Sequence, residues 1–586
     1  MGVPTKILAG EHKTMERFDR AFFKDAWQLT VPYWRSPEKK LAYALLAVVV
    51  ALNLGIVYIN VLLTDWYNGF YDALQHYQAA AFWSAMLRFS WLAGIFIALA
   101  VYQTYLAEML YIRWRRWLTD YYVGEWLERR TYYRMQLAHS GADNPDQRIA
   151  DDIGAFISGL RHLSLGLLRS VVTLASFLTM LWVLSGRTKL PIHGHMTEIP
   201  GYLVWAALIY SIVGTWLTLK IGRRLIGLNY NQQRYDADFR FALVRVRENS
   251  ESIALYGGEE RERETLTGRF ASVFSNYWSI MRRQKMLNWF ANGYTQIAVI
   301  FPFLVAAPSY FTHAIEIGLI MQIAAAFGQV QNAMSYVVSS FDMLAAWHAV
   351  VDRLSGFHKQ MLKVQDVSKH EGMERSEGNA IALRGLELAL PEGQLLLKDA
   401  DLDIGLGTRV LLNGPSGSGK STLMRALAGI WPYGRGRVTV PPATRSLFLP
   451  QRPYLSLGNL RELLLYPHGD HATSDAVVAQ ALADVGMETL TSQLTIVKQW
   501  SLVLSLGEQQ RLAFARILIQ KPAWIYLDEA TSALDEPAEA ALYSLLRARL
   551  PNSTIVSVGH RTTLKAFHDR AVELRNGSLS TGVAIP

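Results

Sequence analysis

The chain has no cysteine among its 586 residues, and few of its residues are charged. Without cysteine it has no disulfides and no thiolate metal ligands, and this absence fits a chain that passes through an oxidising compartment. Only 18% of the residues are Asp, Glu, Lys or Arg, whereas 51% are hydrophobic. This composition is too apolar for a soluble protein of this size, and the length predicts two to four domains.

Positive charge is absent from two long stretches, between Asn60 and Arg88 and between Met286 and Arg353. By contrast, the residues after position 110 and those of 223–285 are rich in arginine and lysine. The positive-inside rule therefore places the basic segments and both termini in the cytoplasm. The net charge of +9 then reflects membrane topology, so we expect membrane lipids and no nucleic acid among the partners.

Six apolar windows are each about as long as the roughly 20 residues that cross a bilayer as a helix. They are 41–63, 87–109, 165–184, 201–221, 289–310 and 319–338. The basic segments 110–160 and 222–285 are too long for simple connections. We therefore expect spans two to five to continue as helices into the cytoplasm.

Residues 1–20 have no long apolar core, so no cleaved signal peptide is expected, and the cytoplasmic N-terminal segment would cover 1–40. Aromatic and aliphatic residues recur there at helical intervals: Phe18, Phe22, Phe23, Trp27 and Leu29. The pattern fits an amphipathic helix on the membrane surface, or a helix packed on protein. The membrane domain would cover 41–357, a polar linker 358–379, and an α/β domain with a largely parallel sheet 380–586.

Residues 414–421 read GPSGSGKS and follow the apolar run 409–412. Such a loop between a strand and a helix cradles phosphates with its backbone N–H groups, and the helix dipole assists. Lys420 would reach the β- and γ-phosphates, and the Ser421 hydroxyl would bind Mg²⁺. The predicted ATP-binding residues here are Gly414, Pro415, Ser416, Gly417, Ser418, Gly419, Lys420, Ser421 and Thr422.

Two acids end a second apolar run, 524–527, which is expected to be a buried strand. Asp528 is placed to hold Mg²⁺ through water, and Glu529 to orient and deprotonate an attacking water. With the phosphate loop, this pair predicts an ATPase that uses ATP and Mg²⁺.

These motifs, with LSLGEQQRLAFAR at 504–516 and His560, resemble the nucleotide-binding domain of ATP-binding cassette (ABC) transporters. The resemblance implies the Walker A loop at 414–421, the Walker B end at Asp528 and Glu529, and the D-loop with Asp535. It implies catalysis by Glu529 and His560, and Mg²⁺ near Ser421, Asp528 and Gln451 of the Q-loop. Gln451 would also bind ATP, and the signature residues Ser505, Gly507 and Glu508 would bind the ATP of a second copy.

The chain departs from the family pattern at two places. Leu506 and Glu508 stand where Gly and Gln are usual in the signature, whereas Ser505 and Gly507 are kept, so the site is expected to work. Residues 388–397 contain no aromatic side chain to stack on adenine. There is one membrane set and one ATPase in the chain, so the resemblance implies an obligate homodimer.

The stretches 143–153, 248–262 and 301–311 resemble the group of peroxisomal subfamily D and bacterial BacA/SbmA-like transporters. This resemblance implies an exporter-type six-span α-helical domain followed by the α/β P-loop ATPase domain, in a bacterial cell inner membrane. It also implies two coupling loops, formed by Asn144, Asp146, Gln147, Glu251, Gly257 and Gly258. Ordinary loop caps are the alternative for these residues.

Evidence on the substrate comes from polar residues on one face of the last window: Gln322, Gln329, Asn332 and Tyr336. They would line a wet cavity or join helices through side-chain hydrogen bonds. We favour import of antimicrobial-type peptides or other bulky hydrophilic cargo such as cobalamin or bleomycin. The alternatives are an exporter of peptides or lipids, a fatty-acyl transporter, and a non-transporting membrane ATPase that acts as a sensor.

Overall fold

The computed structural model describes residues 20–137, 144–185, 190–192, 195–197, 200–367, 372–467, 473–580 and 583–584. The chain divides into two compact units. Unit 1 comprises Met1–Gly124 and Asp143–His358, and unit 2 comprises Glu125–Ala142 and Lys359–Pro586.

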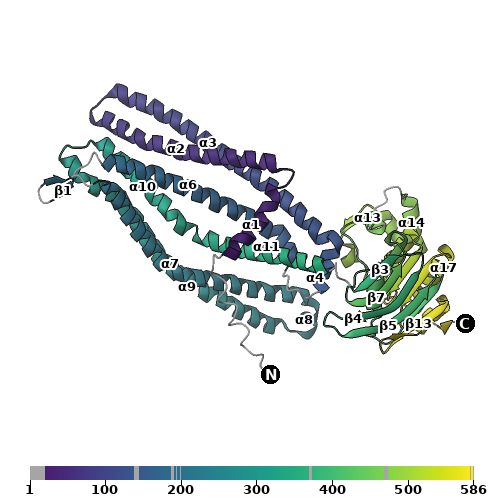
Figure 1. Cartoon of the computed structure of the whole chain (residues 1–586). Helices are drawn as coiled ribbons and strands as arrows, with labels where there is room; N and C mark the ends of the chain where they lie inside the picture. Colours follow the sequence, from purple (N-terminus) through teal and green to yellow (C-terminus); the bar gives the residue numbers. More distant parts are fainter. Residues whose placement is uncertain are drawn as a thin grey trace. The chain divides into compact units, whose positions relative to one another are not determined.

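Unit 1 consists of long helices with a small hairpin of two strands (Figure 1). Its elements are α1 (Arg20–Trp34), α2 (Lys39–Gln75), α3 (Ala79–Leu127, its end in unit 2), α5 (Pro145–Gln147), α6 (Ile153–Ser185), β1 (Leu190–Ile192), β2 (His195–Thr197), α7 (Tyr202–Glu248), α8 (Ser250–Tyr256), α9 (Glu259–Phe311), α10 (Ile317–Ser339) and α11 (Phe341–Val367, its end in unit 2). A short π-helical segment, Arg148–Asp152, joins α5 to α6.

Three of these helices are far longer than a bilayer is thick. α3, α7 and α9 contain 49, 47 and 53 residues, which corresponds to about 70–80 Å at 1.5 Å per residue. The hydrocarbon core of a bilayer is only about 30 Å thick. Each helix therefore continues well beyond its apolar window, as the basic segments predicted.

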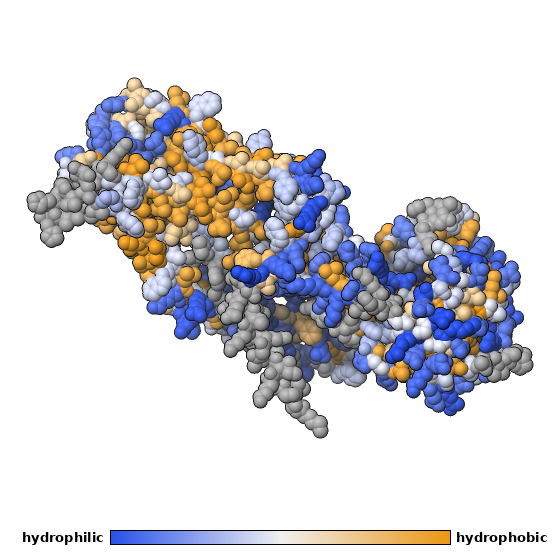
Figure 2. Space-filling view, in the orientation of Figure 1, coloured by the Kyte–Doolittle hydropathy of each residue, from blue (hydrophilic) through white to orange (hydrophobic). Residues whose placement is uncertain are grey.

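Among the described residues, five helical stretches are long and apolar enough to cross a membrane. They are Lys39–Gln75, Ala79–Leu137, Pro145–Ser185, Tyr202–Glu248 and Glu259–Phe311. The sixth predicted window, 319–338, lies in α10. Apolar residues gather over much of the visible surface of this unit (Figure 2).

The start of α10 is attached to the end of α2. The Gly318 N–H donates to Asp72 Oδ1 at 2.9 Å, and the Ile317 N–H donates to Gln75 Oε1 at 3.0 Å. These side chains satisfy N–H groups that a helix start leaves without an intrahelical acceptor. A Cβ on Gly318 would lie 2.2 Å from the Asn68 carbonyl oxygen, so only glycine permits this close approach.

One face of α1 packs on protein, which is one of the two interpretations of the N-terminal helix, whereas its place on the membrane surface stays a prediction. Phe22 and Leu29 are buried in unit 1, where Phe22 stacks on His348 with ring centroids 4.4 Å apart. Phe23 and Trp27 are 61% and 68% exposed. Phe18, which was grouped with them, lies outside the described residues.

Unit 2 begins with α4 (Thr131–Leu137) and otherwise has an α/β pattern. Its further elements are β3 (Met373–Glu377), β4 (Ile381–Ala389), β5 (Leu395–Ile404), β6 (Arg409–Asn413), α12 (Lys420–Leu427), β7 (Gly434–Val440), β8 (Ser446–Leu449), β9 (Gly458–Asn459), α13 (Leu460–Leu465), α14 (Asp475–Asp484), β10 (Val497–Lys498), α15 (Trp500–Val503), α16 (Leu506–Gln520), β11 (Trp524–Asp528), α17 (Glu536–Arg549), β12 (Thr554–Val558), β13 (Arg570–Arg575), β14 (Ser578–Leu579) and β15 (Val583–Ala584).

The central sheet of unit 2 has the strand order β14-β13-β6-β12-β11-β8, with β15 paired to β13. The pairs β6–β12, β12–β11, β11–β8 and β13–β6 are parallel, as the sequence predicted. Strands β11 and β12 are almost fully buried because helices cover both faces of the sheet. Their carboxyl ends therefore meet at one edge, where the predicted catalytic residues follow.

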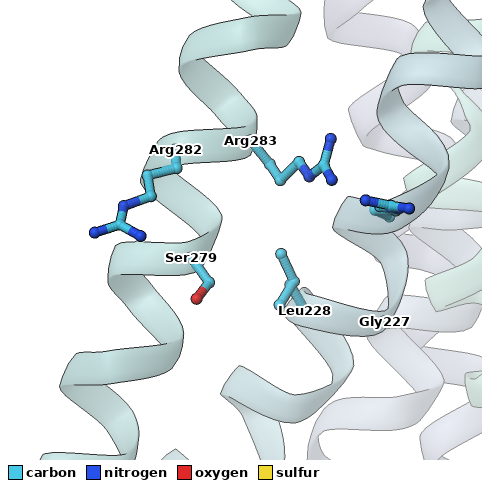
Figure 3. Close-up of a pocket in the computed structure, with 6 residues that line it drawn as sticks. Gly227, Leu228, Ser279, Arg282 and Arg283 are labelled. Atoms are coloured by element: carbon cyan, nitrogen blue, oxygen red, sulfur yellow. The ribbon is translucent and has the colours of Figure 1, made fainter.

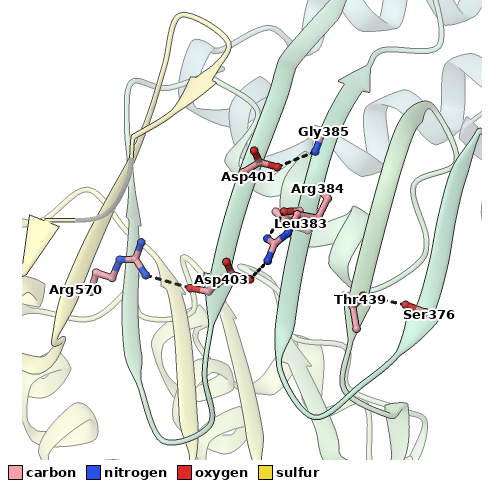
Figure 4. Close-up of polar contacts among 8 residues, drawn as sticks. All are labelled: Ser376, Leu383, Arg384, Gly385, Asp401, Asp403, Thr439 and Arg570. Atoms are coloured by element: carbon pink, nitrogen blue, oxygen red, sulfur yellow. Dashed lines mark hydrogen bonds and ion pairs between the residues drawn. The ribbon is translucent and has the colours of Figure 1, made fainter.

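A second sheet has the order β3-β7-β4-β5. Polar contacts hold its strands together: Arg384 donates to Asp403 Oδ1 at 2.7 Å, and the Gly385 N–H donates to Asp401 Oδ1 at 2.9 Å (Figure 4). Arg570 of β13 donates to the Asp403 carbonyl oxygen at 3.1 Å. This bond ties the second sheet to the central one.

The segment 358–379, predicted as a linker, contains regular structure. α11 continues to Val367, and Met373–Glu377 forms β3, parallel to β7. β3 is an edge strand with mostly exposed side chains, so its sequence carries no apolar alternation that could have revealed it. Residues 125–137, expected in the membrane domain, belong to unit 2.

Candidate functional site

The loop between β6 and α12 requires glycine at two positions. Gly414 has φ 148°, and a Cβ there would lie 2.3 Å from the Leu574 carbonyl oxygen. Gly419 has φ 100° and directly precedes α12. Only glycine adopts these conformations without strain. The loop thereby directs its backbone N–H groups and the start of α12 to the same place.

Two polar side chains of this loop fit a phosphate ligand. Ser418 Oγ is buried and has no hydrogen-bond partner among the described residues. Lys420 is buried too, and its ammonium donates to the carbonyl oxygens of Gly414 and Pro415 at 2.9 and 2.8 Å. Burial lowers the pKa of Lys420, although Glu529 and Asp528 oppose this effect. A triphosphate would compensate the buried charge and accept the hydrogen bond of Ser418.

Ser421 and Asp528 fit a Mg²⁺ site. The Ser421 hydroxyl donates to Asp528 Oδ1 at 3.0 Å. Burial raises the pKa of Asp528, and the bond from Ser421 partly offsets this rise. Mg²⁺ prefers a few oxygen ligands together with substrate phosphates rather than a cage of acids. A hydroxyl, a nearby carboxylate and a phosphate loop satisfy that requirement.

Glu529 connects the ends of two central strands. Its N–H donates to the Val558 carbonyl oxygen at 3.1 Å, and its carboxylate oxygens lie 3.0 Å from Gln451 Nε2 and 3.1 Å from His560 Nε2. The residue has φ 49°, unusual for a side chain other than glycine. The structure thus brings Gln451, Asp528, Glu529 and His560 together with the phosphate loop. Thr422 is buried in the first turn of α12.

The signature segment forms the start of α16. Ser505 and Glu508 make a reciprocal capping box, in which Glu508 Oε2 accepts from Ser505 N and Ser505 Oγ, both at 2.8 Å. Ser505 is exposed at this end. A Cβ on Gly507 would approach Leu534 and the Ala533 carbonyl at 3.2 and 3.3 Å, so glycine lets the D-loop pack closely. Asp535 caps α17 by accepting from the Ala538 N–H at 3.1 Å.

The far end of α12 is held by two arginines that the sequence analysis missed. Arg130, just before α4, donates to the carbonyl oxygens of Ala428 and Gly429 at 2.8 and 3.0 Å. Arg375 of β3 donates to those of Ala426 and Leu427 at 2.9 and 2.7 Å. Cations at a helix C-terminus are favourable because they meet its free carbonyls and dipole. For Arg130 the only signal was the basic cluster that was interpreted as membrane topology, and Arg375 lies in the segment predicted as a linker.

The predicted coupling residues all lie in unit 1. Asn144 precedes α5 with φ 50° and makes no side-chain cap, while Asp146 and Gln147 are exposed in α5. Glu251 is exposed in the first turn of α8, which ends at Gly257 with φ 63°, followed by Gly258 at the start of α9. The last two residues of α8, Leu255 and Tyr256, are 79% and 89% exposed.

The four polar residues of α10 divide into two groups. Gln322 is buried and donates to Asp65 Oδ1 at 3.4 Å, and the Tyr336 hydroxyl donates to the His162 carbonyl at 3.1 Å. These two residues join helices, which was the alternative interpretation. Gln329 is half-buried and Asn332 is exposed.

Two family models match the chain. Residues 28–311 match the model described as ABC transporter transmembrane region 2, and residues 397–532 match that described as ABC transporter. In fold, the chain is similar to a bacterial Atm1-family ABC exporter with ATP bound, with a TM-score of 0.65 and 18% identity, over 94% of this chain and 96% of that one.

Three curated relatives cover most of the chain. The inner membrane ABC transporter ATP-binding protein YddA of Escherichia coli is 34% identical, over 91% of this chain and 94% of the relative. ABC transporter D family member 2, chloroplastic, of Arabidopsis thaliana is 34% identical, over 95% and 86%. The human lysosomal cobalamin transporter ABCD4 is 26% identical, over 95% and 94%. The chain therefore belongs to the ABC transporter family, as an ATP-hydrolysing half-transporter that joins one membrane domain to one ATP-binding domain.

Proposed function

We propose that two copies of this chain form a homodimer in a bacterial inner membrane and use ATP to import bulky hydrophilic cargo, either peptides or a cobalamin-like compound. The main observation that supports ATP-driven transport is the cluster of Gln451, Glu529 and His560 beside the Ser421–Asp528 pair. The cargo class is supported by the relative named as a cobalamin transporter. We propose that Gln329 and Asn332 line the cargo cavity.

In this proposal each ATP lies between two copies. The phosphate loop and Lys420 of one copy bind the phosphates, and the exposed Ser505, with Gly507, of the second copy closes over them. Glu529 holds and deprotonates the attacking water, His560 fixes the Glu529 carboxylate, and Gln451 contacts the same carboxylate. Mg²⁺, bound near Ser421 and Asp528, would neutralise phosphate charge.

Closure of the dimer would move the membrane helices through the ends of the helical hairpins. The chain runs from α3 directly into Arg130, which caps α12 at the end opposite the phosphate loop. We propose that α5 and α8 are further docking points, through Asp146 and Glu251. The exposed Leu255 and Tyr256 support a protein contact for α8, because large apolar side chains seldom stay so exposed. In the proposed topology, six helices span the membrane and both termini lie in the cytoplasm.

Uptake by cells tests the function. Cells that carry the wild type or Glu529→Gln are given a labelled peptide and labelled cobalamin, with Glu488→Gln, an exposed acid of the same unit, as the control. We expect uptake with the wild type and the control, and none above vector cells with Glu529→Gln. Uptake that does not depend on Glu529, or export of a preloaded peptide or lipid, would contradict the proposed import.

A further inference from the structure

Arginines line a cavity between α7 and α9 that the transport cycle does not use. The Arg283 side chain is directed toward α7, and that of Arg282 is directed away from it (Figure 3). The cavity has a volume of about 520 Å³ and is lined by Arg224, Gly227, Leu228, Ser279, Arg282 and Arg283. Gly227 and Leu228 come from α7, and the other labelled residues come from α9 (Figure 3). Among the described residues, none of the three arginines lies within ion-pair distance of a carboxylate. Their charge is therefore available to an anionic ligand.

The same pair of helices carries an apolar groove next to this cavity. It has a volume of about 690 Å³, and aromatic side chains dominate its wall: Tyr210, Trp289, Phe290, Tyr294 and Phe301. Tyr210 and Tyr294 stack with centroids 4.6 Å apart. A Cβ on Gly214 would lie 2.2 Å from the Tyr294 ring, so this glycine makes room for the stacked pair. Trp289 and Ile297 are 78% and 59% exposed along the groove.

The dimensions fit a lipid of one leaflet. From Trp289 to Phe301 the groove follows α9 over about 18 Å at 1.5 Å per residue, and one leaflet of hydrocarbon is about 15 Å thick. Arg283 lies about 9 Å further along the same helix, close to the thickness of a headgroup layer. The apolar window 201–221 ends just before Arg224, and the apolar window 289–310 begins just after Arg283. The arginines thus lie at the level of the headgroups.

We propose that this site binds an anionic phospholipid, with its phosphate on Arg224 and Arg283 and an acyl chain in the aromatic groove. Charge complementarity favours this occupant, because basic pockets between membrane helices attract anionic headgroups. A zwitterionic lipid would fill the groove but gain little from the two cations. The site is separate from the ATP site and from the residues proposed to line the cargo cavity.

The test measures binding of phosphatidylglycerol and of phosphatidylcholine to the purified full chain by native mass spectrometry. The variants are Arg282→Gln/Arg283→Gln and, as a control with the same loss of charge on α9, Arg261→Gln/Arg263→Gln. Arg261 and Arg263 pair with Glu264 and Glu260 at 3.1 and 2.9 Å, away from the cavity. We expect the wild type and the control to bind phosphatidylglycerol about tenfold more tightly than phosphatidylcholine. In the Arg282→Gln/Arg283→Gln variant this preference should be lost.

A second variant tests the groove. A Cβ on Gly293 meets no described atom within 4 Å, so Gly293→Trp should fill the groove and weaken both lipids, whereas Gly293→Ala should not. Equal binding of the two lipids to the wild type, or displacement of phosphatidylglycerol by millimolar inorganic phosphate, would overturn the proposal. A disulfide between two Ile297→Cys copies that forms equally well with and without lipid would also overturn the proposal. A second copy, and not a lipid, would then cover the groove. The absence of native cysteine makes this last assay specific.

Discussion

His560 Nε2 lies 3.1 Å from Glu529 Oε1, although the two residues are 31 positions apart in the chain. The two residues meet because β11 and β12 are parallel neighbours, with Asp528 in register with Val558. The imidazole contacts one carboxylate oxygen of Glu529, and Gln451 Nε2 donates to the other. A single acid is thus positioned by groups from two further loops.

Replacing Glu529 with Gln should abolish turnover and preserve nucleotide binding. The amide keeps the shape of the side chain but cannot accept the proton of the water, so the ATPase rate should fall by about 10²–10⁴. Lys420→Ala should instead weaken ATP binding, because it removes the cation of the phosphate loop. Radiolabelled ATP binding and phosphate release, measured on both variants, distinguish the two effects. Identical behaviour of the two variants would contradict these roles.

Replacing Glu508 with Gln should strengthen ATP use. Glu508 Oε2 accepts from Ser505 Oγ at 2.8 Å, so a negative charge lies beside the hydroxyl that is proposed to meet the γ-phosphate. Gln retains the capping contact and removes a repulsion of roughly 1 kcal/mol after screening by solvent. We expect the KM for ATP to fall severalfold with little change in thermal stability. A KM equal to that of the Glu488→Gln control would show that Ser505 does not approach the phosphates.

Replacing Arg130 with Ala should disturb coupling more than chemistry. Arg130 contributes a cation at the C-terminus of α12, and its loss should cost about 0.3–1 kcal/mol of local stability. We expect transport per ATP hydrolysed to fall, with basal ATPase activity nearly kept. Arg129→Ala is the matched control, because Arg129 pairs with Glu128 at 3.7 Å. If both variants transport equally, the cap is only structural.

Replacing Asp528 with Asn should stabilise the nucleotide-free protein while it abolishes hydrolysis. Burial raises the pKa of Asp528 in the folded chain. At pH values between the unfolded-state and folded-state pKa of Asp528, the folded chain therefore binds more protons than the unfolded chain. The stability of the folded chain falls as pH rises through that window. Asn carries no charge and still accepts from Ser421, so the midpoint of thermal unfolding at neutral pH should rise. The gain should vanish at a pH below both pKa values.

The phosphate loop, the Asp528–Glu529 pair and the buried strands that carry them could be predicted because each depends on local sequence. Glycines at 414 and 419 and an apolar strand before each motif define the site without knowledge of the fold. Arg130 could not be found in this way, since its acceptors lie about 300 residues away. The edge strand β3 was missed because its side chains are exposed, and Gln322 joins a helix more than 250 residues distant.

In the proposed cycle, the 53-residue helix α9 would act as a lever. A rod about 80 Å long that tilts by about 5° displaces its far tip by roughly 7 Å relative to its pivot. In that cycle, modest rotations driven by nucleotide binding would therefore be enough to open or close a passage for a molecule of several ångströms. Pro302 and Pro308 both lie within this helix, and because proline removes a hydrogen bond of the helix interior, they are where the rod would bend most easily.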